Sequence, residues 1–312
     1  MRTLICGSLA YDTIMVFEDR FQHHILPDKI HILSVAFLVP EMRREYGGTA
    51  GNIAYNLKLL GGEPLIMSTV GHDFADYRRR LEQLGILQTH VREVSEAFTA
   101  QAFITTDLDD NQITAFHPGA MNFSHLNRVT DASGATFGVV APDGREGMCQ
   151  HAREFHQAGI PFLFDPGQGL PMFNGEELLA FLDQASYLAV NDYEAQLMCE
   201  KTGLPFEALA SRVKAAIVTK GAEGSVIHTE GEQIHVPAVH ADTVEDPTGC
   251  GDAYRAGLLY GISKHWPWAK TGRLASLMGA IKIAHRGGQN HHPSRDEIAM
   301  RFEQAFGIPL DE

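Results

Sequence analysis

The stretch Asp246-Pro247-Thr248-Gly249-Cys250-Gly251-Asp252 combines residue types that a phosphate site needs. Its two glycines free the backbone just before a helix-like run, and the N–H groups at a helix start can bind an anion. A carboxylate repels phosphate, so Asp252 is better suited to take a proton from a hydroxyl that attacks phosphorus. A plain glycine loop with an N-capping Asp fits equally well, and the stretch alone favours neither.

Asn191 and Glu194 bracket a predicted strand-to-helix turn. Mg²⁺ keeps its waters and is bound by few carboxylates, so these side chains could face a hydrated Mg²⁺ or the phosphates of a nucleotide. An ordinary helix start is at least as well supported. In that interpretation Asn191 is the N-cap and Glu194 completes a capping box.

A glycine turn follows the parallel-type strand predicted at residues 215–220. In an open sheet the ligand lies outside the carboxyl ends of the strands, so Thr219, Lys220, Gly221 and Gly224 would approach a nucleotide closely. Taken in isolation, the turn fits a plain β-turn better. The chain has no Gly-Lys-Ser/Thr run, which excludes a P-loop enzyme.

Asp12 follows the first predicted strand, and Asn52 lies at the start of the helix that Gly47-Gly48 opens. A carboxylate and an amide over one sheet edge can bind vicinal hydroxyls of a sugar. The glycine pair also fits a simple hinge. The sixteen histidines show no metal-binding spacing, and we expect His23-His24 and His291-His292 to be solvated turn residues.

Strands and helices alternate regularly over most of the chain. This pattern predicts a parallel sheet covered by helices on both faces, with two antiparallel edge strands near residue 230. The predicted strands are residues 3–7, 64–70, 137–141, 161–165, 187–191, 215–220, 224–229 and 233–237, and the predicted helices are residues 53–60, 74–84, 148–158, 175–184, 193–202, 252–264, 270–285 and 295–306.

Two segments interrupt this alternation, at about residues 12–45 and 98–120. The first holds short apolar pieces at 14–17, 30–33 and 35–39, and the second holds two strands joined by an Asp/Asn-rich turn. We expect one domain, residues 1–312, in which both segments meet as a small β-sheet lid.

Composition narrows the class of protein. A net charge of −14 and a pI near 5.5 argue against binding to nucleic acid or to an anionic membrane. The four cysteines are scattered, which predicts reduced thiols, and no apolar run approaches the roughly 20 residues that span a bilayer. We expect a cytoplasmic protein.

Together these motifs resemble the ribokinase, or PfkB, family of carbohydrate and nucleoside kinases, and the resemblance covers nearly the whole chain. It implies a ribokinase-like α/β fold, a doubly wound αβα sandwich with a small β-sheet lid. The matching motifs, in chain order, are residues 47–54 with Gly61, Asn191 with Glu194, residues 219–224, and residues 246–252 with Ala256-Gly257.

The resemblance further implies ATP- and Mg²⁺-dependent phosphorylation of a hydroxymethyl group, with Asp252 as general base. Pro247 and Cys250 depart from the usual motif, which has Thr and a small residue there, but neither removes the backbone N–H groups of residues 249–251. The other implied roles are an anion hole at Gly249, Cys250 and Gly251; a ribose clamp of Asp12, Gly48 and Asn52; nucleotide contacts from Asn191, Thr219, Lys220, Gly221, Gly224, Ala284 and His285; Mg²⁺ held by Glu194 and Asn191 through water; and K⁺ at Asp246 and Thr248.

Within the family, residues 7–12, 116–121 and 164–169 look like those of prokaryotic adenosine or broad-specificity nucleoside kinases. A nucleoside substrate is therefore implied, and candidates to contact its base are Phe103, Phe116, Met121 and Gln168. Two alternatives stay open: a kinase of free sugars such as ribose or fructose, and a nucleotide-binding regulator without activity. Asp252 argues against the regulator. A monomer and a lid-mediated homodimer fit equally well.

Overall fold

The computed structural model describes residues 2–25, 32, 34–109 and 111–311. Its core is a nine-stranded sheet in the order β13-β12-β11-β10-β9-β8-β1-β4-β5. In this order the neighbouring strands β11, β10, β9, β8, β1, β4 and β5 run parallel to one another. Strands β12 and β13 are antiparallel additions at the β11 edge. The strands are β1 (Arg2–Cys6), β4 (Glu63–Gly71), β5 (Leu87–Val94), β8 (Phe137–Val140), β9 (Phe162–Phe164), β10 (Tyr187–Asn191), β11 (Ala215–Thr219), β12 (Ser225–Thr229) and β13 (Glu232–Val236).

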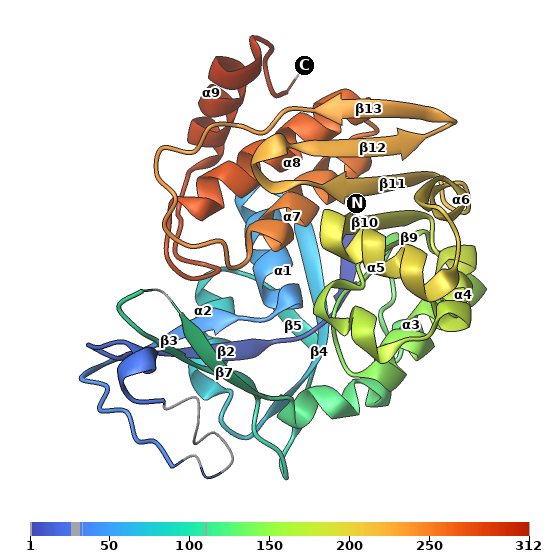
Figure 1. The fold of residues 1–312 in the computed structure, drawn as a ribbon. Helices are drawn as coiled ribbons and strands as arrows, with labels where there is room; N and C mark the ends of the chain where they lie inside the picture. The colour runs from blue at the N-terminus through green and yellow to red at the C-terminus, as the bar shows by residue number, and fades with distance from the viewer. Residues whose placement is uncertain (1, 26–31, 33, 110, 312) are drawn as a thin grey trace.

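Helices cover both faces of this sheet (Figure 1). Each face has its own apolar cluster, as expected for central strands that are apolar along their whole length. One face carries α1 (Thr49–Leu59), α2 (Ala75–Gln83), α7 (Cys250–Ser263), α8 (Trp268–Ile283) and α9 (Arg295–Phe306), and the other carries α3 (Arg145–Gln157), α4 (Gly175–Gln184), α5 (Asp192–Thr202) and α6 (Phe206–Ala210). Short 3-10 helices are η1 (Phe21–His23), η3 (Gly119–Leu126), η4 (Val129–Asp131), η5 (Gly167–Met172) and η6 (Gly221–Glu223).

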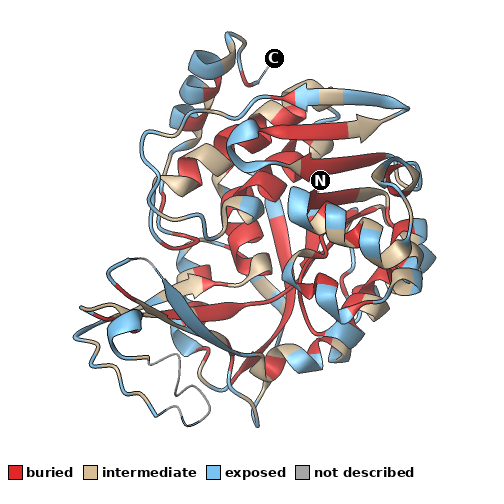
Figure 2. Cartoon of the chain, in the orientation of Figure 1, coloured by how far each residue is buried: buried red, intermediate tan, exposed pale blue. Residues whose placement is uncertain are grey.

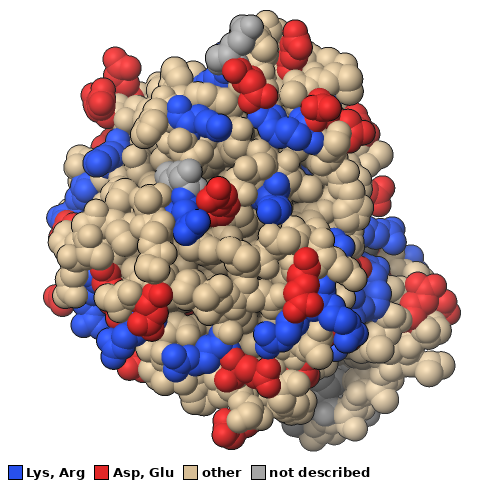
Figure 3. Space-filling view, turned by 180° about the vertical axis from the view of Figure 1, so that it is seen from behind, with Lys and Arg blue, Asp and Glu red and all other residues tan. Residues whose placement is uncertain are grey.

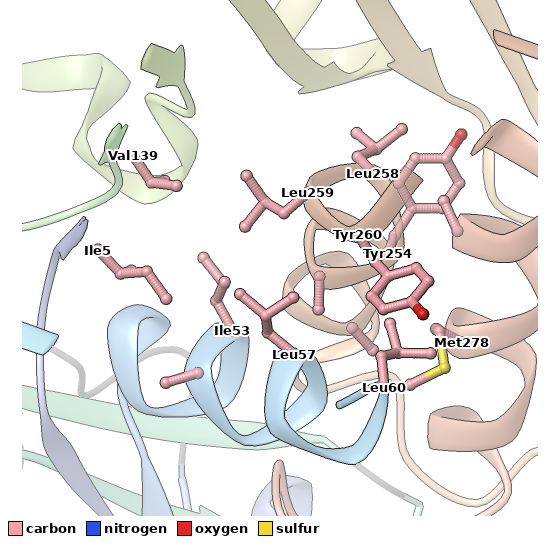
Figure 4. Close-up of a cluster of buried hydrophobic side chains, with 14 of the residues drawn as sticks. Ile5, Ile53, Leu57, Leu60, Val139, Tyr254, Leu258, Leu259, Tyr260 and Met278 are labelled. Atoms are coloured by element: carbon pink, nitrogen blue, oxygen red, sulfur yellow. The ribbon is translucent and has the colours of Figure 1, made fainter. Parts of the chain in front are cut away.

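The contact between α1 and α7 matters most for the site, because these helices carry Asn52 and Asp252. Ile53 and Leu57 of α1 and Leu258 and Leu259 of α7 belong to one buried cluster (Figure 4). Close packing of this kind resists displacement, so the two helix starts keep a defined spacing.

A second, four-stranded sheet stands beside the core (Figure 1). Its order is β3-β2-β6-β7, with β2 antiparallel to β3 and parallel to β6. Strand β7 is exposed along its whole length (Figure 2). The strands are β2 (Ala10–Val16), β3 (Glu41–Gly47), β6 (Ala100–Thr106) and β7 (Gln112–His117).

Two predictions are wrong, and two elements were not predicted. Residues 35–39 are irregular backbone, and the strand that pairs with β2 is the more polar β3; the piece at 30–33 lies outside the described residues except for Ile32. Strand β5 and helix α6 were not predicted. His291 is fully buried rather than solvated, because its Nε2 pairs with Asn56 Oδ1 at 2.7 Å and its ring packs on Tyr55.

Charged side chains of both signs are interspersed on the face shown in Figure 3. Among the described residues, no helix has the length and apolar character that a membrane span requires.

Candidate active site

The site lies at the edge of the large sheet where the parallel strands end. Ser8 follows β1, Pro142 follows β8, and Asn191 and Thr219 end neighbouring strands in register. The Ser8 amide donates to the Pro142 carbonyl at 3.1 Å, and the Thr49 hydroxyl donates to the same carbonyl at 3.1 Å. These bonds fix the start of α1 over the strand ends.

The Asn52 side chain points from α1 toward Asp252, and hydrogen bonds to both its nitrogen and its oxygen fix its orientation. Its Nδ2 donates to Asp252 Oδ2 at 2.8 Å, while its Oδ1 accepts from Gln289 Nε2 at 3.1 Å. The residue is 4% exposed, so solvent does not compete for these bonds. Gly48, at φ 85°, turns the chain into α1 in a conformation that favours glycine.

The Asp252 carboxyl has a pKa raised to about 7. Burial is the main cause, the bond from Asn52 opposes it, and the nearby charge of Asp165 adds to it while Arg255 reduces it. A carboxylate with a pKa near neutrality can accept a proton from a hydroxyl at physiological pH. Asp252 therefore has the environment of a general base.

A buried ion pair places the helix that carries Asp252. Arg255 donates to both oxygens of Asp165 at 3.1 Å, and both side chains are 5% exposed. Arg255 also donates to the Ala189 carbonyl of β10 at 3.4 Å. Sequence reasoning missed this pair, although a lone Arg among Ala, Leu and Gly in a predicted helix is a signal for it.

The turn before α7 supplies backbone amides. Gly249 has φ 77° as the N-cap of α7, a left-handed conformation that suits glycine. The Cys250 amide donates to the Pro247 carbonyl at 3.1 Å. Of the three amides predicted to form the anion hole, that of Cys250 is therefore already hydrogen-bonded within the turn. The amides of Gly249 and Gly251 have no such bond among the described residues and remain able to bind an anion.

Asp246, at the start of the turn, is held by backbone and by a lysine. Its two carboxylate oxygens accept the amides of Thr248 and Gly287, each at 2.8 Å. Burial raises its pKa, but these bonds outweigh burial and the pKa is lowered overall. Its carbonyl accepts the ammonium of Lys282, which sequence reasoning also missed.

A pocket of about 540 Å³ runs from this turn to the end of β11. Cys250 and Gly251 line one side, and Thr219, Gly221 and Gly224 line the other. The structure therefore brings the two predicted glycine turns to one cavity. Ala284 and His285 were predicted to contact the nucleotide, but among the described residues their neighbour Ile283 lines this pocket instead. Lys220 does not line the pocket either, and its side chain is exposed.

Asn191 and Glu194 form the capping box of α5. The Glu194 amide donates to Asn191 Oδ1 at 2.7 Å, and the Asn191 amide donates to Glu194 Oε2 at 2.8 Å. The structural interpretation of this pair is thus confirmed. Burial raises the pKa of Glu194, with a further contribution from Asp165. No group of three or more His, Cys, Asp or Glu side chains in the described part of the chain could hold a metal ion by itself.

Asp12 lies on β2 of the small sheet, close to the other acids of the site. Burial raises its pKa to about 6, and Asp246 and Glu45 add to the shift. In the strand register Asp12 pairs with Ala102, and Ala102 pairs with Phe116, so Asp12 and Phe116 share a face. Phe103 pairs with Thr13 and lies on the opposite face, away from Asp12.

The remaining base-contact candidates are in short 3-10 helices at the same end of the strands. Met121 lies in η3 and is partly exposed, and Gln168 lies in η5 and is exposed. Neither makes a side-chain hydrogen bond that holds it in place among the described residues. The structure thus brings together Asp12, Asn52, Asp252 and the glycine turns.

Comparison with known proteins places these features in a family. The model of the pfkB family carbohydrate kinases matches residues 12–295. The nucleoside kinase of Methanocaldococcus jannaschii is 34% identical over 269 residues, which cover 85% of this chain and 88% of that protein.

Solved structures agree with this match. Burkholderia thailandensis nucleoside kinase in complex with inosine is 55% identical, with a TM-score of 0.90 over 98% of this chain and 99% of that chain. Its complex with ADP-inosine is 56% identical, with a TM-score of 0.88 over 98% and 97%. Thermotoga maritima ribokinase, at 23% identity, has a TM-score of 0.82 over 97% and 99% and shares the fold. The predicted ribokinase-like fold is confirmed.

Proposed function

Because this chain belongs to the pfkB family of carbohydrate kinases, we propose that it is an ATP-dependent nucleoside kinase that forms nucleoside 5′-monophosphates. The observation that carries the proposal is the Asp252 carboxylate, which Asn52 holds at the start of α7 with a pKa near 7, beside the pocket that joins the two glycine turns. The nucleoside substrate is supported by the 55% identical enzyme solved with inosine.

The reaction uses three parts of the site. Asp252 removes the proton of the 5′-hydroxyl, and the oxygen attacks the γ-phosphorus of ATP as the bond to ADP breaks. The amides of Gly249 and Gly251 stabilise the charge of the transferred group. The triphosphate lies along the pocket toward Thr219 and Gly224.

Mg²⁺, which enters with ATP, would neutralise phosphate charge in this reaction. Glu194 fits a role in holding it through water, because its capping bond uses only Oε2 and its second carboxylate oxygen remains for a metal-bound water. Asn191 orients Glu194 through the capping box.

Asp12 would bind the vicinal hydroxyls of the ribose. It lies on the small sheet, whereas Asp252 lies on a helix of the large sheet. A nucleoside bound to both would draw the small sheet over the site as a lid, which excludes water and suppresses hydrolysis of ATP. Phe116, on the same face as Asp12, is then the aromatic side chain placed to contact the base.

The test is a panel of purine and pyrimidine nucleosides, ribose and fructose, each assayed with Mg·ATP by release of ADP and by identification of the product. We expect turnover of nucleosides to their 5′-monophosphates. Turnover of free sugars alone would reject the nucleoside substrate in favour of a sugar kinase. Tight ATP binding without any turnover would favour a regulator.

A further inference from the structure

Lys282 is fully buried behind the anion hole, which is rare for a lysine unless its ammonium is paired. The residue lies in the last turn of α8. Its Nζ donates to the carbonyl oxygens of Asp246 and His285, both at 2.8 Å. The ammonium is therefore bound by backbone oxygens, as a metal cation would be.

The two carbonyls belong to two loops that converge on the general base. Asp246 begins the turn that leads through Gly249 into α7. His285 begins the loop that leads to Gln289, whose side chain donates to Asn52 Oδ1. Lys282 thus joins the turn of the anion hole to the loop that orients the partner of Asp252.

The expected K⁺ at Asp246 and Thr248 does not fit these surroundings. K⁺ is bound by several oxygens that surround it, and a positive group placed among those oxygens repels it. Here both carboxylate oxygens of Asp246 accept backbone amides, and its carbonyl accepts Lys282. An ion that shared the carbonyls of Asp246 and His285 would have to occupy the position of Lys282 Nζ.

We propose that the Lys282 ammonium is a built-in cation that takes the place of a monovalent ion behind the anion hole, so that the reaction does not depend on K⁺. This inference rests on the proposed kinase function and adds to it the ion requirement of the same site. Lys282 is a positioning residue: it holds the turn and the loop at their spacing, and its positive charge in a poorly solvated region favours the negative phosphates nearby.

The first experiment compares the wild-type protein in chlorides of K⁺, Na⁺ and tetramethylammonium at equal ionic strength. We expect kcat and the affinity for ADP, measured by calorimetry, to agree within about twofold across the salts, because only general screening changes. A stimulation specific to K⁺ of about fivefold or more in either quantity would overturn the proposal. Absence of turnover in every salt would instead count against the kinase function, and the calorimetry would still decide whether K⁺ acts at the nucleotide site.

The second experiment replaces the charge with a side chain of similar length. We expect Lys282→Met to lower kcat about ten- to a hundredfold, the range for loss of a charged hydrogen bond, with a smaller change in KM for the nucleoside. K⁺ or NH₄⁺, but not tetramethylammonium, should restore part of kcat and raise the melting temperature of the variant, because the vacated space can take a small cation.

Lys201 offers a matched control. It lies in the last turn of α5, and its Nζ donates to the Phe173 carbonyl at 2.8 Å, far from the general base in the sequence and on the opposite face of the sheet. Lys201→Met should keep its activity and show no ion response. Wild-type kcat in Lys282→Met, or a loss that no small cation restores, would overturn the proposal. Should that variant fail to fold, the wild-type salt series decides alone.

Discussion

The chemistry of the site depends first on the protonation of one residue. Burial raises the pKa of Asp252, the proposed base, to about 7, so its carboxylate form is lost as the pH falls below neutrality. Below this value kcat/KM should fall about tenfold per pH unit as the carboxylate is protonated, and above it the rate should level off. A pH profile of kcat/KM with saturating Mg·ATP measures this.

Asp252→Asn keeps the shape of the side chain and removes the proposed base. We expect kcat to fall roughly 10²- to 10⁴-fold while nucleoside binding changes little, and the pH dependence near 7 should disappear. The Asn52 bond gives the amide a partner, so folding should be kept. Normal turnover in this variant would show that another group accepts the proton.

The functional residues within the motifs could be predicted because each motif is a short, continuous stretch of sequence. Asp252 follows two glycines at a helix start, and this spacing together with the other motifs of the family indicates an anion site with a base. Arg255 and Lys282 could not be predicted in the same way. Arg255 pairs with Asp165, 90 residues away, and Lys282 binds the Asp246 carbonyl, 36 residues away, so only the folded chain shows that these charges are buried and paired.

At the scale of elements, the turn into α7 depends on glycine. Gly249 has φ 77°, and a Cβ there would lie 3.3 Å from Asn52 Nδ2. We expect Gly249→Ala to cost about 1–2 kcal/mol of folding free energy and also to displace Asn52, lowering kcat. Gly203, with φ 70° and open space around it, is the matched control. Gly203→Ala should lose similar stability in thermal unfolding with kcat unchanged; equal kcat in both variants would contradict the role of the turn.

The ion pair between α7 and the sheet makes a second prediction at this scale. Asp165→Asn leaves the buried Arg255 without its counter-charge, which should cost about 3–5 kcal/mol in chemical unfolding. Loss of the negative charge also lowers the pKa of Asp252, so the midpoint of the pH profile should move to the acid side. Asp183→Asn, in the exposed pair with Arg212, should cost only about 0–1 kcal/mol. Similar losses in both variants would contradict the prediction.

Elements were predictable where their apolar pattern matched their burial. The buried strands β8 to β11 are short apolar runs, and the sequence located each within a few residues. The small sheet shows the limit of that rule. Its strand β3 is polar and partly exposed, and it forms a strand because it pairs with β2. The apolar residues 35–39 have no strand partner among the described residues and are irregular.

At the scale of the whole molecule, the two sheets divide the proposed nucleoside site between them. Asp12 belongs to the small sheet and Asp252 to a helix that covers the large one, yet the charge of Asp12 contributes to the raised pKa of Asp252. The alternation of strands and helices predicts the large sheet. The relation of the two sheets follows from contacts that no local pattern encodes, such as the Tyr77 hydroxyl of α2 donating to the Gly47 carbonyl at 2.8 Å.

If a nucleoside bridges the two sheets, its binding should slow amide hydrogen exchange in β2 and β6 as the small sheet closes. Asp12→Ala should raise KM for the nucleoside about tenfold or more and remove this protection, because contacts to the ribose hydroxyls exist before the transition state. Glu41 lies on the same face of the small sheet but opposite Val16, at the far end of β2, so Glu41→Ala should leave both KM and the protection unchanged. An unchanged KM in Asp12→Ala would show that Asp12 does not bind the ribose. If the nucleoside still slowed amide exchange in this variant, closure of the small sheet would depend on the face around Phe116 instead.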